Sequence, residues 1–302
     1  MNVVVLGGGD SPERGVSLRS ARSVTVAAHQ AGFNIEEADP KEGLSILDGV
    51  ASSSVVLPIL HGAGGEDGSL QAELERRGLP FLGSGSQSSK QCFDKWQTRQ
   101  AIASCGLPIA EGELVTAQTY SKSPLHKRPH VLKVNHGGSS IGTLIVRQPG
   151  NVSQKAIDQV FELDNRAVIE KLIEGAEVTV AILDSSALPV VEIVPPPGGE
   201  FDYDNKYNGQ TRELCPPVSI KPNVQKKVQA LAEEVHKTMS CRHLSRVDIM
   251  IDSSDSLFVL EINTIPGLTD QSLYPKAAQV SGLGMPQLVR RFINMVARDY
   301  SL

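Results

Sequence analysis

Residues 2–9 read NVVVLGGG, an unbroken apolar run that ends in three glycines. Such a run is typical of a strand that is buried on both faces, and the glycines permit a tight turn after it. A helical pattern follows from about Val16 to Ala31, and a second apolar run, Val55–Leu60, precedes another helical pattern at Ser69–Arg77. Buried strands that alternate with helices predict a parallel sheet with helices on its faces.

Beyond this region the pattern changes to shorter strands and helices. The segment Gly78–Ser89 is rich in Gly, Pro and Ser. This composition predicts an irregular segment, with a domain boundary just after it. Strands are expected at His130–Lys133, Gly142–Val146, Ala167–Lys171, Glu177–Leu183, Val190–Val194, Arg246–Ile251 and Ser256–Ile262. Helices are expected at Asp94–Cys105, Asn223–Met239 and Met285–Ala297, which together indicate α+β units.

The composition limits the classes of protein to which the chain can belong. Its 302 residues allow two domains or three small ones, and 40% hydrophobic with 21% charged residues is an ordinary globular balance. The net charge is −5 without long runs of either sign, so nucleic-acid and membrane-surface partners are not expected. No apolar run approaches the length that spans a bilayer, and the first ten residues lack the basic region of a signal peptide.

The four cysteines, Cys92, Cys105, Cys215 and Cys241, lie far apart in the sequence and form no C-x-x-C motif. The sequence therefore contains no zinc or redox motif. We interpret the cysteines as reduced thiols of a cytoplasmic protein.

Two glycine-rich segments are candidate nucleotide-binding loops. The first, Gly7–Gly9, would need glycine at position 12 for a dinucleotide-binding pattern, but Pro12 stands there, so a tight strand-to-helix turn is favoured. The second, Val134–Gly142 (VNHGGSSIG), follows Lys133 at the end of a predicted strand. Its N–H and hydroxyl groups could surround phosphates beside the lysine, although a flexible hairpin fits the pattern equally well.

The strongest local signal of chemistry lies on two consecutive predicted strands, SRVDIMID (245–252) and FVLEINT (258–264). Asp248 lies on the first strand, and Glu261 and Asn263 lie two residues apart on the second, so the latter two project from one face. Two carboxylates and an amide oxygen suit Mg²⁺, which prefers oxygen ligands. Their flanking residues are strongly apolar, which argues against a solvent-facing edge because buried charges need a partner.

The segment after the second strand could receive a carboxylate. Thr264–Thr269 form a predicted turn whose Gly267 can approach a ligand closely. A short helix is expected from Gln271 through Ala278, with the hydroxyl of Ser272 at its N-terminus. A helix N-terminus with a hydroxyl donor suits a carboxylate, but a serine that only caps the helix is the simpler reading.

In this order and spacing, the segments resemble the D-alanine–D-alanine ligases, members of the ATP-grasp superfamily. The resemblance extends over nearly the whole chain. The segments that carry it are Gly8–Ser20 (GGDSPERGVSLRS), His61–Gln71 (HGAGGEDGSLQ), Leu79–Gly85 (LPFLGSG) with Asp94 and Lys95, Gly138–Gly142 (GSSIG), Glu170–Glu177 (EKLIEGAE), Asp202–Tyr207 (DYDNKY) and Arg246–Ala278.

The resemblance implies a three-domain ATP-grasp fold of mixed α/β and α+β class. Residues 1–93 would form an N-terminal Rossmann-like substrate domain with a parallel sheet, residues 94–171 a central ATP-grasp domain with the phosphate loop, and residues 172–302 a C-terminal ATP-grasp domain with the Mg²⁺ site. The implied reaction converts ATP and two D-alanines to D-alanyl-D-alanine, ADP and phosphate through an acyl phosphate, for peptidoglycan precursors. A cytoplasmic homodimer that uses two Mg²⁺ or Mn²⁺ ions is expected.

The resemblance also implies roles for individual residues. ATP would be held by Lys95, Lys133, Ser139, Ser140, Glu170, Lys171, Ile173, Glu177, Lys206 and Leu260, with Glu170–Ile173 as the adenine hinge. Metal ligands would be Asp248, Glu261 and Asn263. D-Alanine would be bound by Glu13, His61, Lys206, Arg246, Gly267, Ser272 and Leu273. The catalytic set implied is Glu13, Ser139, Tyr207, Arg246, Gly267 and Ser272, in which Glu13, Ser139 and Tyr207 match a hydrogen-bonded trio that links the loops over the site.

The chain departs from the family pattern at three positions. Val134, Gly137 and Glu200 stand where proline, an acidic residue and an aromatic residue are common. These departures concern closure of the phosphate loop and packing around adenine, and they leave the metal ligands intact.

Three other functions fit parts of the pattern. A D-alanine–D-lactate ligase would share the fold. By resemblance, however, that branch of the family has histidine at the position where this chain has Tyr207. Another ATP-grasp carboxylate–amine ligase is disfavoured by Glu13 and by the Gln271–Leu273 motif. A non-catalytic nucleotide-binding protein would be expected to lack Arg246 or a metal ligand such as Asp248, and both are present.

Overall fold

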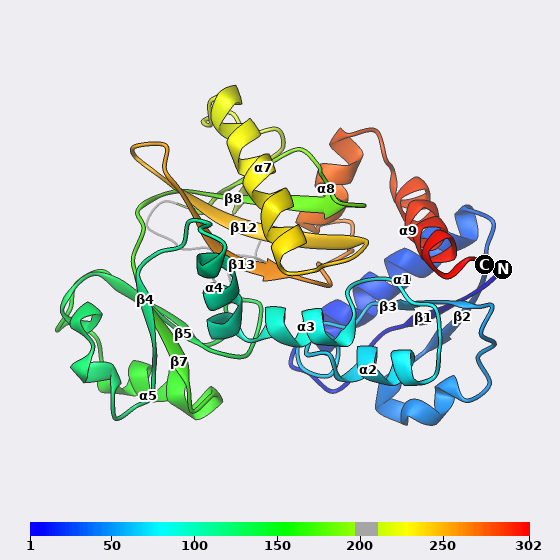
Figure 1. Cartoon of the computed structure of the whole chain (residues 1–302), viewed down its shortest axis with the longest axis horizontal. Coiled ribbons are helices and arrows are strands. Elements are labelled where there is room, and N and C mark those ends of the chain that lie inside the picture. The colour runs from blue at the N-terminus through cyan, green and yellow to red at the C-terminus, as the bar shows by residue number, and fades with distance from the viewer. Residues whose placement is uncertain (197–210) are drawn as a thin grey trace.

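The computed structural model of the protein describes residues 1–196 and 211–302 (Figure 1). The strands are β1 (Asn2–Leu6), β2 (Asn34–Ala38), β3 (Val55–Pro58), β4 (Gly112–Val115), β5 (His130–Val134), β6 (Thr143–Val146), β7 (Ala167–Lys171), β8 (Gly175–Leu183), β9 (Ser186–Ala187), β10 (Val191–Val194), β11 (Arg212–Leu214), β12 (Leu244–Asp252) and β13 (Leu257–Asn263). The α-helices are α1 (Arg14–Gln30), α2 (Ser69–Arg76), α3 (Ser86–Phe93), α4 (Lys95–Ser104), α5 (Gln154–Leu163), α7 (Pro222–Thr238), α8 (Leu273–Val280) and α9 (Met285–Tyr300). Short 3-10 helices are η1 (Pro40–Glu42), η2 (Leu44–Leu47), η3 (Tyr120–Lys122) and η4 (Pro124–Lys127).

The first sheet is parallel, with strand order β2-β1-β3, and helices cover both of its faces. Because successive strand residues point to opposite faces, Val3 and Val5 join a core with α1 and α9, whereas Val4 and Leu6 join a second core with α2. Figure 1 shows α9 beside α1 and the two chain ends close together. The last helix of the chain thus helps to bury the first sheet.

The other two sheets are antiparallel. One has the order β4-β7-β5-β6, and α5 packs against it. The other has the order β11-β10-β8-β12-β13, with β9 beside β8, and α7 and α4 pack against it. The parallel sheet followed by antiparallel sheets confirms the expected mixture of α/β and α+β structure.

The predicted elements from Asn2 onward are found with shifts of a few residues at their ends, but six further α-helices and strands of the described residues were not predicted. These are β2, α3, β4, α5, β9 and β11. The irregular segment predicted at Gly78–Ser89 was wrong in its C-terminal limit, because helix α3 already begins at Ser86. Asp94 is the N-cap of α4, and its carboxylate accepts from the Gln97 N–H at 2.9 Å.

The predicted domain limits stay a prediction. One core joins residues of β1, α1 and β3 to residues of β8, α8 and α9, so the C-terminal segment contributes to the packing of the N-terminal sheet. Within residues 1–196 and 211–302, none of the helices has the length and apolarity that crossing a membrane requires.

Candidate active site

Four polar side chains share one face of the pair of strands β12 and β13. The strand register places Arg246 opposite Asn263 and Asp248 opposite Glu261, with a register shift directly after Asp248. Residues two apart on a strand face the same way, so these four side chains form one cluster. The Arg246 guanidinium donates to Asp248 through Nε at 2.9 Å and Nη2 at 2.7 Å. Burial lowers the pKa of Arg246, but the Asp248 charge outweighs it and holds that pKa above its usual value.

The carboxylates of this cluster fit a hard divalent cation. Asp248 is buried and also accepts a hydrogen bond from the Thr179 hydroxyl, whose strand position lies directly opposite. Glu261 lines the cavity, and its carboxylate has no hydrogen-bond or ion-pair partner in the described part of the chain. Asn263 Oδ1 accepts from the Ile265 N–H at 2.9 Å. Two carboxylates and one amide oxygen are a donor set of the kind that Mg²⁺ takes, with phosphate and water completing the shell.

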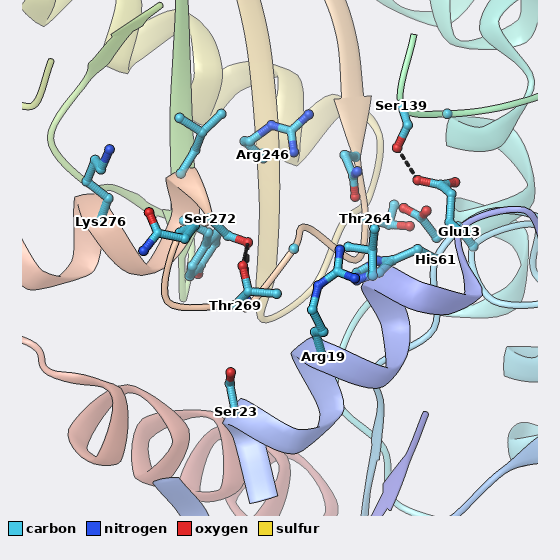
Figure 2. A pocket seen from close by; sticks show the side chains of 18 of the residues that line it. Glu13, Arg19, Ser23, His61, Ser139, Arg246, Thr264, Thr269, Ser272 and Lys276 are labelled. Atoms are coloured by element: carbon cyan, nitrogen blue, oxygen red, sulfur yellow. Dashed lines mark hydrogen bonds between the residues drawn. The ribbon is translucent and has the colours of Figure 1, made fainter. Parts of the chain in front are cut away.

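Glu13 faces this cluster from the start of helix α1. It is the N-cap of α1, it is buried, and it accepts a hydrogen bond from the Ser139 hydroxyl of the glycine-rich loop between β5 and β6 (Figure 2). A Cβ on Gly62 or Gly138 would come within 2.8 or 3.0 Å of Glu13 Oε2, so these glycines leave room for the carboxylate. Ser139 and its neighbour Ser140 have positive φ angles of 53° and 60°, a conformation that is strained for non-glycine residues and occurs in turns and at functional sites.

A second buried carboxylate, Glu66, lies beside Glu13 in the cavity lining. Its Oε2 accepts from the Gly62 N–H at 2.8 Å and its Oε1 from the Ile265 N–H at 3.4 Å. Burial, with the nearby charge of Glu13, raises the pKa of Glu66 to about 8. Near neutral pH Glu66 therefore holds its proton for a large part of the time.

His61 connects helix α1 to the turn after β13. Its Nδ1 donates to the Ile265 carbonyl oxygen at 3.0 Å, which leaves Nε2 to accept from the Ser20 hydroxyl at 3.2 Å. Ser20 in turn accepts from the Leu268 N–H at 3.2 Å. Burial lowers the pKa of His61 to about 4, so the ring is neutral and acts as a positioning residue for the turn that contains Gly267.

The turn after β13 leads into helix α8 at Ser272. Ser272 is the N-cap of α8, but its hydroxyl does not cap that helix. Instead it lies 2.8 Å from Thr269 Oγ1 and accepts from the Thr269 N–H at 3.1 Å (Figure 2). A Cβ on Gly267 would come within 2.8 Å of Ser272 Oγ, so this approach requires glycine. The first N–H groups of α8 and the Ser272 hydroxyl together suit a carboxylate ligand.

A buried ionic group lies behind the glycine-rich loop. Glu170 of β7 binds Lys133 Nζ at 2.6 Å and Arg99 Nη1 at 2.5 Å, and all three side chains are buried. Lys133 Nζ also donates to the Leu260 carbonyl oxygen at 3.4 Å, and Lys95 Nζ donates to the Gly137 carbonyl oxygen of the loop. Glu170 thus fixes Lys133 in place, in addition to any contact it makes with a nucleotide.

Arg99→Met should lower the free energy of unfolding by about 3–5 kcal/mol, because it leaves the buried Glu170 carboxylate with one cation in place of two. Arg99→Lys keeps the charge and should cost less. Denaturant unfolding of both variants checks this expectation. A change below about 0.5 kcal/mol for Arg99→Met would show that Lys133 alone satisfies Glu170.

A single cavity of about 1110 Å³ brings together part of the predicted site. The predicted residues that line it are Glu13, His61, Lys95, Ser139, Arg246, Glu261, Asn263, Gly267, Ser272 and Leu273. The other described residues of the predicted site do not line this cavity, namely Lys133, Ser140, Glu170, Lys171, Ile173, Glu177, Asp248 and Leu260. Lys206, Tyr207 and the departure at Glu200 lie outside the described residues.

Sequence reasoning missed several residues that support the site. Glu66 lies within the HGAGGEDG segment quoted above, and its burial next to Glu13 is visible only in the fold. Thr179 and Arg99 carry no local signal, because their contacts with Asp248 and Glu170 span 69 and 71 residues of sequence.

The comparisons of this chain with known proteins all lead to the same family. Residues 102–294 match the family model described as D-ala D-ala ligase C-terminus. A D-alanine–D-alanine ligase of Mannheimia succiniciproducens is 37% identical over 98% of this chain and 97% of its own length. Solved structures give the same result: the ligase of Bacillus anthracis in complex with ATP has a TM-score of 0.86 at 27% identity, covering 100% of this chain and 99% of that one. The Coxiella burnetii enzyme has a TM-score of 0.82 at 26% identity, covering 100% of this chain and 96% of that one.

Proposed function

The chain belongs to the D-alanine–D-alanine ligase family, and from this premise we propose that it joins two D-alanines into D-alanyl-D-alanine while it converts ATP to ADP and phosphate. It is a ligase of the ATP-grasp fold, and its product is a precursor for peptidoglycan. The observation that carries the proposal is the cluster of Arg246, Asp248, Glu261 and Asn263, which faces Glu13 across one cavity.

The chemistry explains why the site holds both anions and cations. A carboxylate is a poor acylating agent, so the first D-alanine must be activated by phosphorylation of its carboxylate. The amine of the second D-alanine then attacks the acyl phosphate, and phosphate leaves. Negative charge builds up on the transferred phosphoryl group and on the tetrahedral carbon's oxygen, and both need stabilisation.

We assign Asp248, Glu261 and Asn263 as the residues that hold Mg²⁺ or Mn²⁺. When bound, the cation neutralises phosphate charge as a Lewis acid. Two lysines near the glycine-rich loop can bind phosphate oxygens through their ammonium groups. Lys95 contacts the loop, and Lys133 lies behind it. Ser139 and Ser140 contribute hydroxyl donors, and Glu170–Ile173, Glu177 and Leu260 are proposed to bind the nucleoside.

The two D-alanine sites are proposed at opposite sides of Arg246. Glu13 binds the ammonium of the first D-alanine, and the Arg246 guanidinium with the Gly267 N–H stabilises the oxyanion. Ser272 and the Leu273 N–H, at the start of α8, receive the carboxylate of the second D-alanine. Lys206 and Tyr207 are assigned to this second site from the family resemblance alone.

Glu13→Gln should raise the KM for the first D-alanine about tenfold, because a charge-assisted hydrogen bond to the ammonium is replaced by a neutral one. The KM for ATP should change much less. Steady-state kinetics with each substrate varied in turn measure both constants, and Glu36→Gln, at an exposed position of β2, is a matched control. An equal rise in the KM for ATP would assign Glu13 to holding the Ser139 loop instead.

The direct test of the proposed function is phosphate release with D-alanine, D-lactate and L-alanine compared. We expect release with D-alanine and ATP, product analysis that shows D-alanyl-D-alanine, and little turnover with L-alanine. A D-alanine–D-lactate ligase would form D-alanyl-D-lactate when D-alanine and D-lactate are mixed, and a non-catalytic nucleotide-binding protein would release no phosphate in any mixture.

The use of ATP and of a free amino acid supports a cytoplasmic enzyme, as expected from the sequence. No nucleic-acid or membrane partner is proposed, and the homodimer stays a prediction of the resemblance.

A further inference from the structure

Two cysteines that are 149 residues apart in the sequence meet in the fold. Cys92 lies in the last turn of α3 and Cys241 in the connection between α7 and β12, and their sulfur atoms are 3.8 Å apart. Cys92 is 7% exposed, whereas Cys241 is partly exposed. The other thiols, Cys105 and Cys215, are free as well. Separation along the sequence therefore does not keep this pair apart in the fold.

The two segments that carry the sulfurs are held together by hydrogen bonds. The Ser88 hydroxyl of α3 donates to the Met239 carbonyl oxygen at 2.7 Å and lies 3.7 Å from Cys241 Sγ. The Arg242 N–H donates to Ser84 Oγ at 3.2 Å. A disulfide needs an S–S distance of about 2.05 Å, so an approach of roughly 2 Å between segments already in contact is sufficient.

We propose that Cys92 and Cys241 form a modification site, a reversible disulfide that hydroperoxides generate. The Cys241 thiolate attacks the peroxide, so that an S–O bond forms, the O–O bond breaks and hydroxide leaves as water. The Cys92 sulfur then attacks the Cys241 sulfenic acid; the S–S bond forms, the S–O bond breaks, and the oxygen leaves as water with the proton of Cys92. Two thiols are oxidised and one hydroperoxide is reduced, and a dithiol reductant reverses the reaction.

The order of these steps follows from the environment of each sulfur. The hydrogen bond between the two thiols raises the pKa of the Cys92 thiol and lowers the pKa of the Cys241 thiol. Burial raises the pKa of Cys92 further. The hydroxyls of Ser84 and Ser88 favour the thiolate of Cys241. Cys241 is also the more exposed of the two. Cys241 is therefore the nucleophile and Cys92 the resolving thiol.

The position of Cys92 couples this site to the cavity. Cys92 lines the cavity beside Phe93, and Lys95 follows three residues later at the start of α4. The Cys92 carbonyl oxygen also accepts from the Thr98 hydroxyl at 3.2 Å, and this bond links the end of α3 to α4. Drawing Cys92 toward Cys241 displaces the first turn of α4 and with it Lys95, which weakens binding of the ATP phosphates; this consequence rests on the proposed function.

The cross-link is tested on the full-length protein with hydrogen peroxide as the probe. Free thiols per denatured chain should fall from four to two, and peptide mass mapping without reductant should join the peptides of Cys92 and Cys241. Cys105→Ser should still lose two thiols, whereas Cys92→Ser and Cys241→Ser should form no internal link. Wild-type protein that keeps all four thiols, or that links Cys105 or Cys215 instead, would overturn the proposal.

The coupling to ATP is measured on the same samples. Oxidised wild-type enzyme should show a KM for ATP about tenfold higher, the scale of one lost charge-assisted hydrogen bond, and dithiothreitol should restore it. Cys241→Ser treated in the same way should keep its KM. A cross-linked enzyme with an unchanged KM for ATP would overturn the regulatory part. A reduced enzyme without any ligase activity would contradict the proposed function and not the disulfide. The two outcomes can be told apart because the disulfide is detected by mass mapping, which does not depend on activity.

Discussion

Glu261→Gln is expected to reduce ligation at least about 10³-fold while the protein remains folded, because metal-ion stabilisation of the transferred phosphoryl group is worth several kcal/mol. The amide keeps the volume of the side chain and removes the charge that Mg²⁺ needs. Glu261 makes no salt bridge within the described part of the structure, and its charge acts on Arg246 and Lys95 only at longer range, so the loss of this charge should affect the fold much less than the loss of a paired carboxylate. Phosphate release and a thermal melt of the same sample measure the two effects.

Asp248→Asn should abolish ligation as well, but with a different effect on stability. Asp248 pairs with Arg246 and accepts from Thr179, so its neutralisation leaves a partly buried guanidinium without its salt-bridge partner. We therefore expect Asp248→Asn to lower the melting temperature and Glu261→Gln to leave it unchanged. Glu234→Gln on the exposed surface of α7 is the control for both variants. Turnover like that of the wild type in both variants at moderate Mg²⁺ would refute the metal assignment.

Arg246→Met is expected to lower kcat by about 10²–10³-fold, the usual loss for one donor to a developing oxyanion. Its effect on the KM for ATP should be small, because the guanidinium pairs with Asp248 and is proposed to face the acyl centre rather than the nucleoside. Arg246→Lys keeps a positive charge but loses the two parallel hydrogen bonds to Asp248, so it should recover part of kcat. Single-turnover and steady-state rates of both variants provide the measurement. An unchanged kcat in a folded Arg246→Met enzyme would remove the arginine from the oxyanion site.

The elements predicted from the sequence are those whose burial gives a clear pattern. The run NVVVL is buried from its second residue on and forms β1. β2 reads NIEEA and is half-buried at the edge of its sheet, so it carries no apolar run that periodicity could detect. α3 begins inside a Ser-rich segment and could not be separated from a loop, because its three buried residues include two serines.

The site could be predicted only as far as local spacing reaches. The two-residue interval between Glu261 and Asn263 sufficed to place them on one face, but the pairing of Asp248 with Glu261 depends on strand register, which is interrupted by the shift after Asp248. Contacts between residues far apart in the sequence could not be predicted from local patterns. The contact between Cys92 and Cys241 is one of these, because it joins α3 to the segment after α7, 149 residues later in the sequence.

The most direct test of the account is the fate of oxygen from the D-alanine carboxylate. With D-alanine labelled by ¹⁸O in both carboxylate oxygens, activation as an acyl phosphate makes one labelled oxygen the bridge to phosphorus, and attack by the second amine expels it with the phosphate. The account predicts that the released phosphate, measured by mass spectrometry, carries one ¹⁸O for each dipeptide formed. Phosphate without label, released alongside the dipeptide, would contradict the acyl-phosphate reaction that the cluster of Arg246, Asp248, Glu261 and Asn263 is proposed to perform.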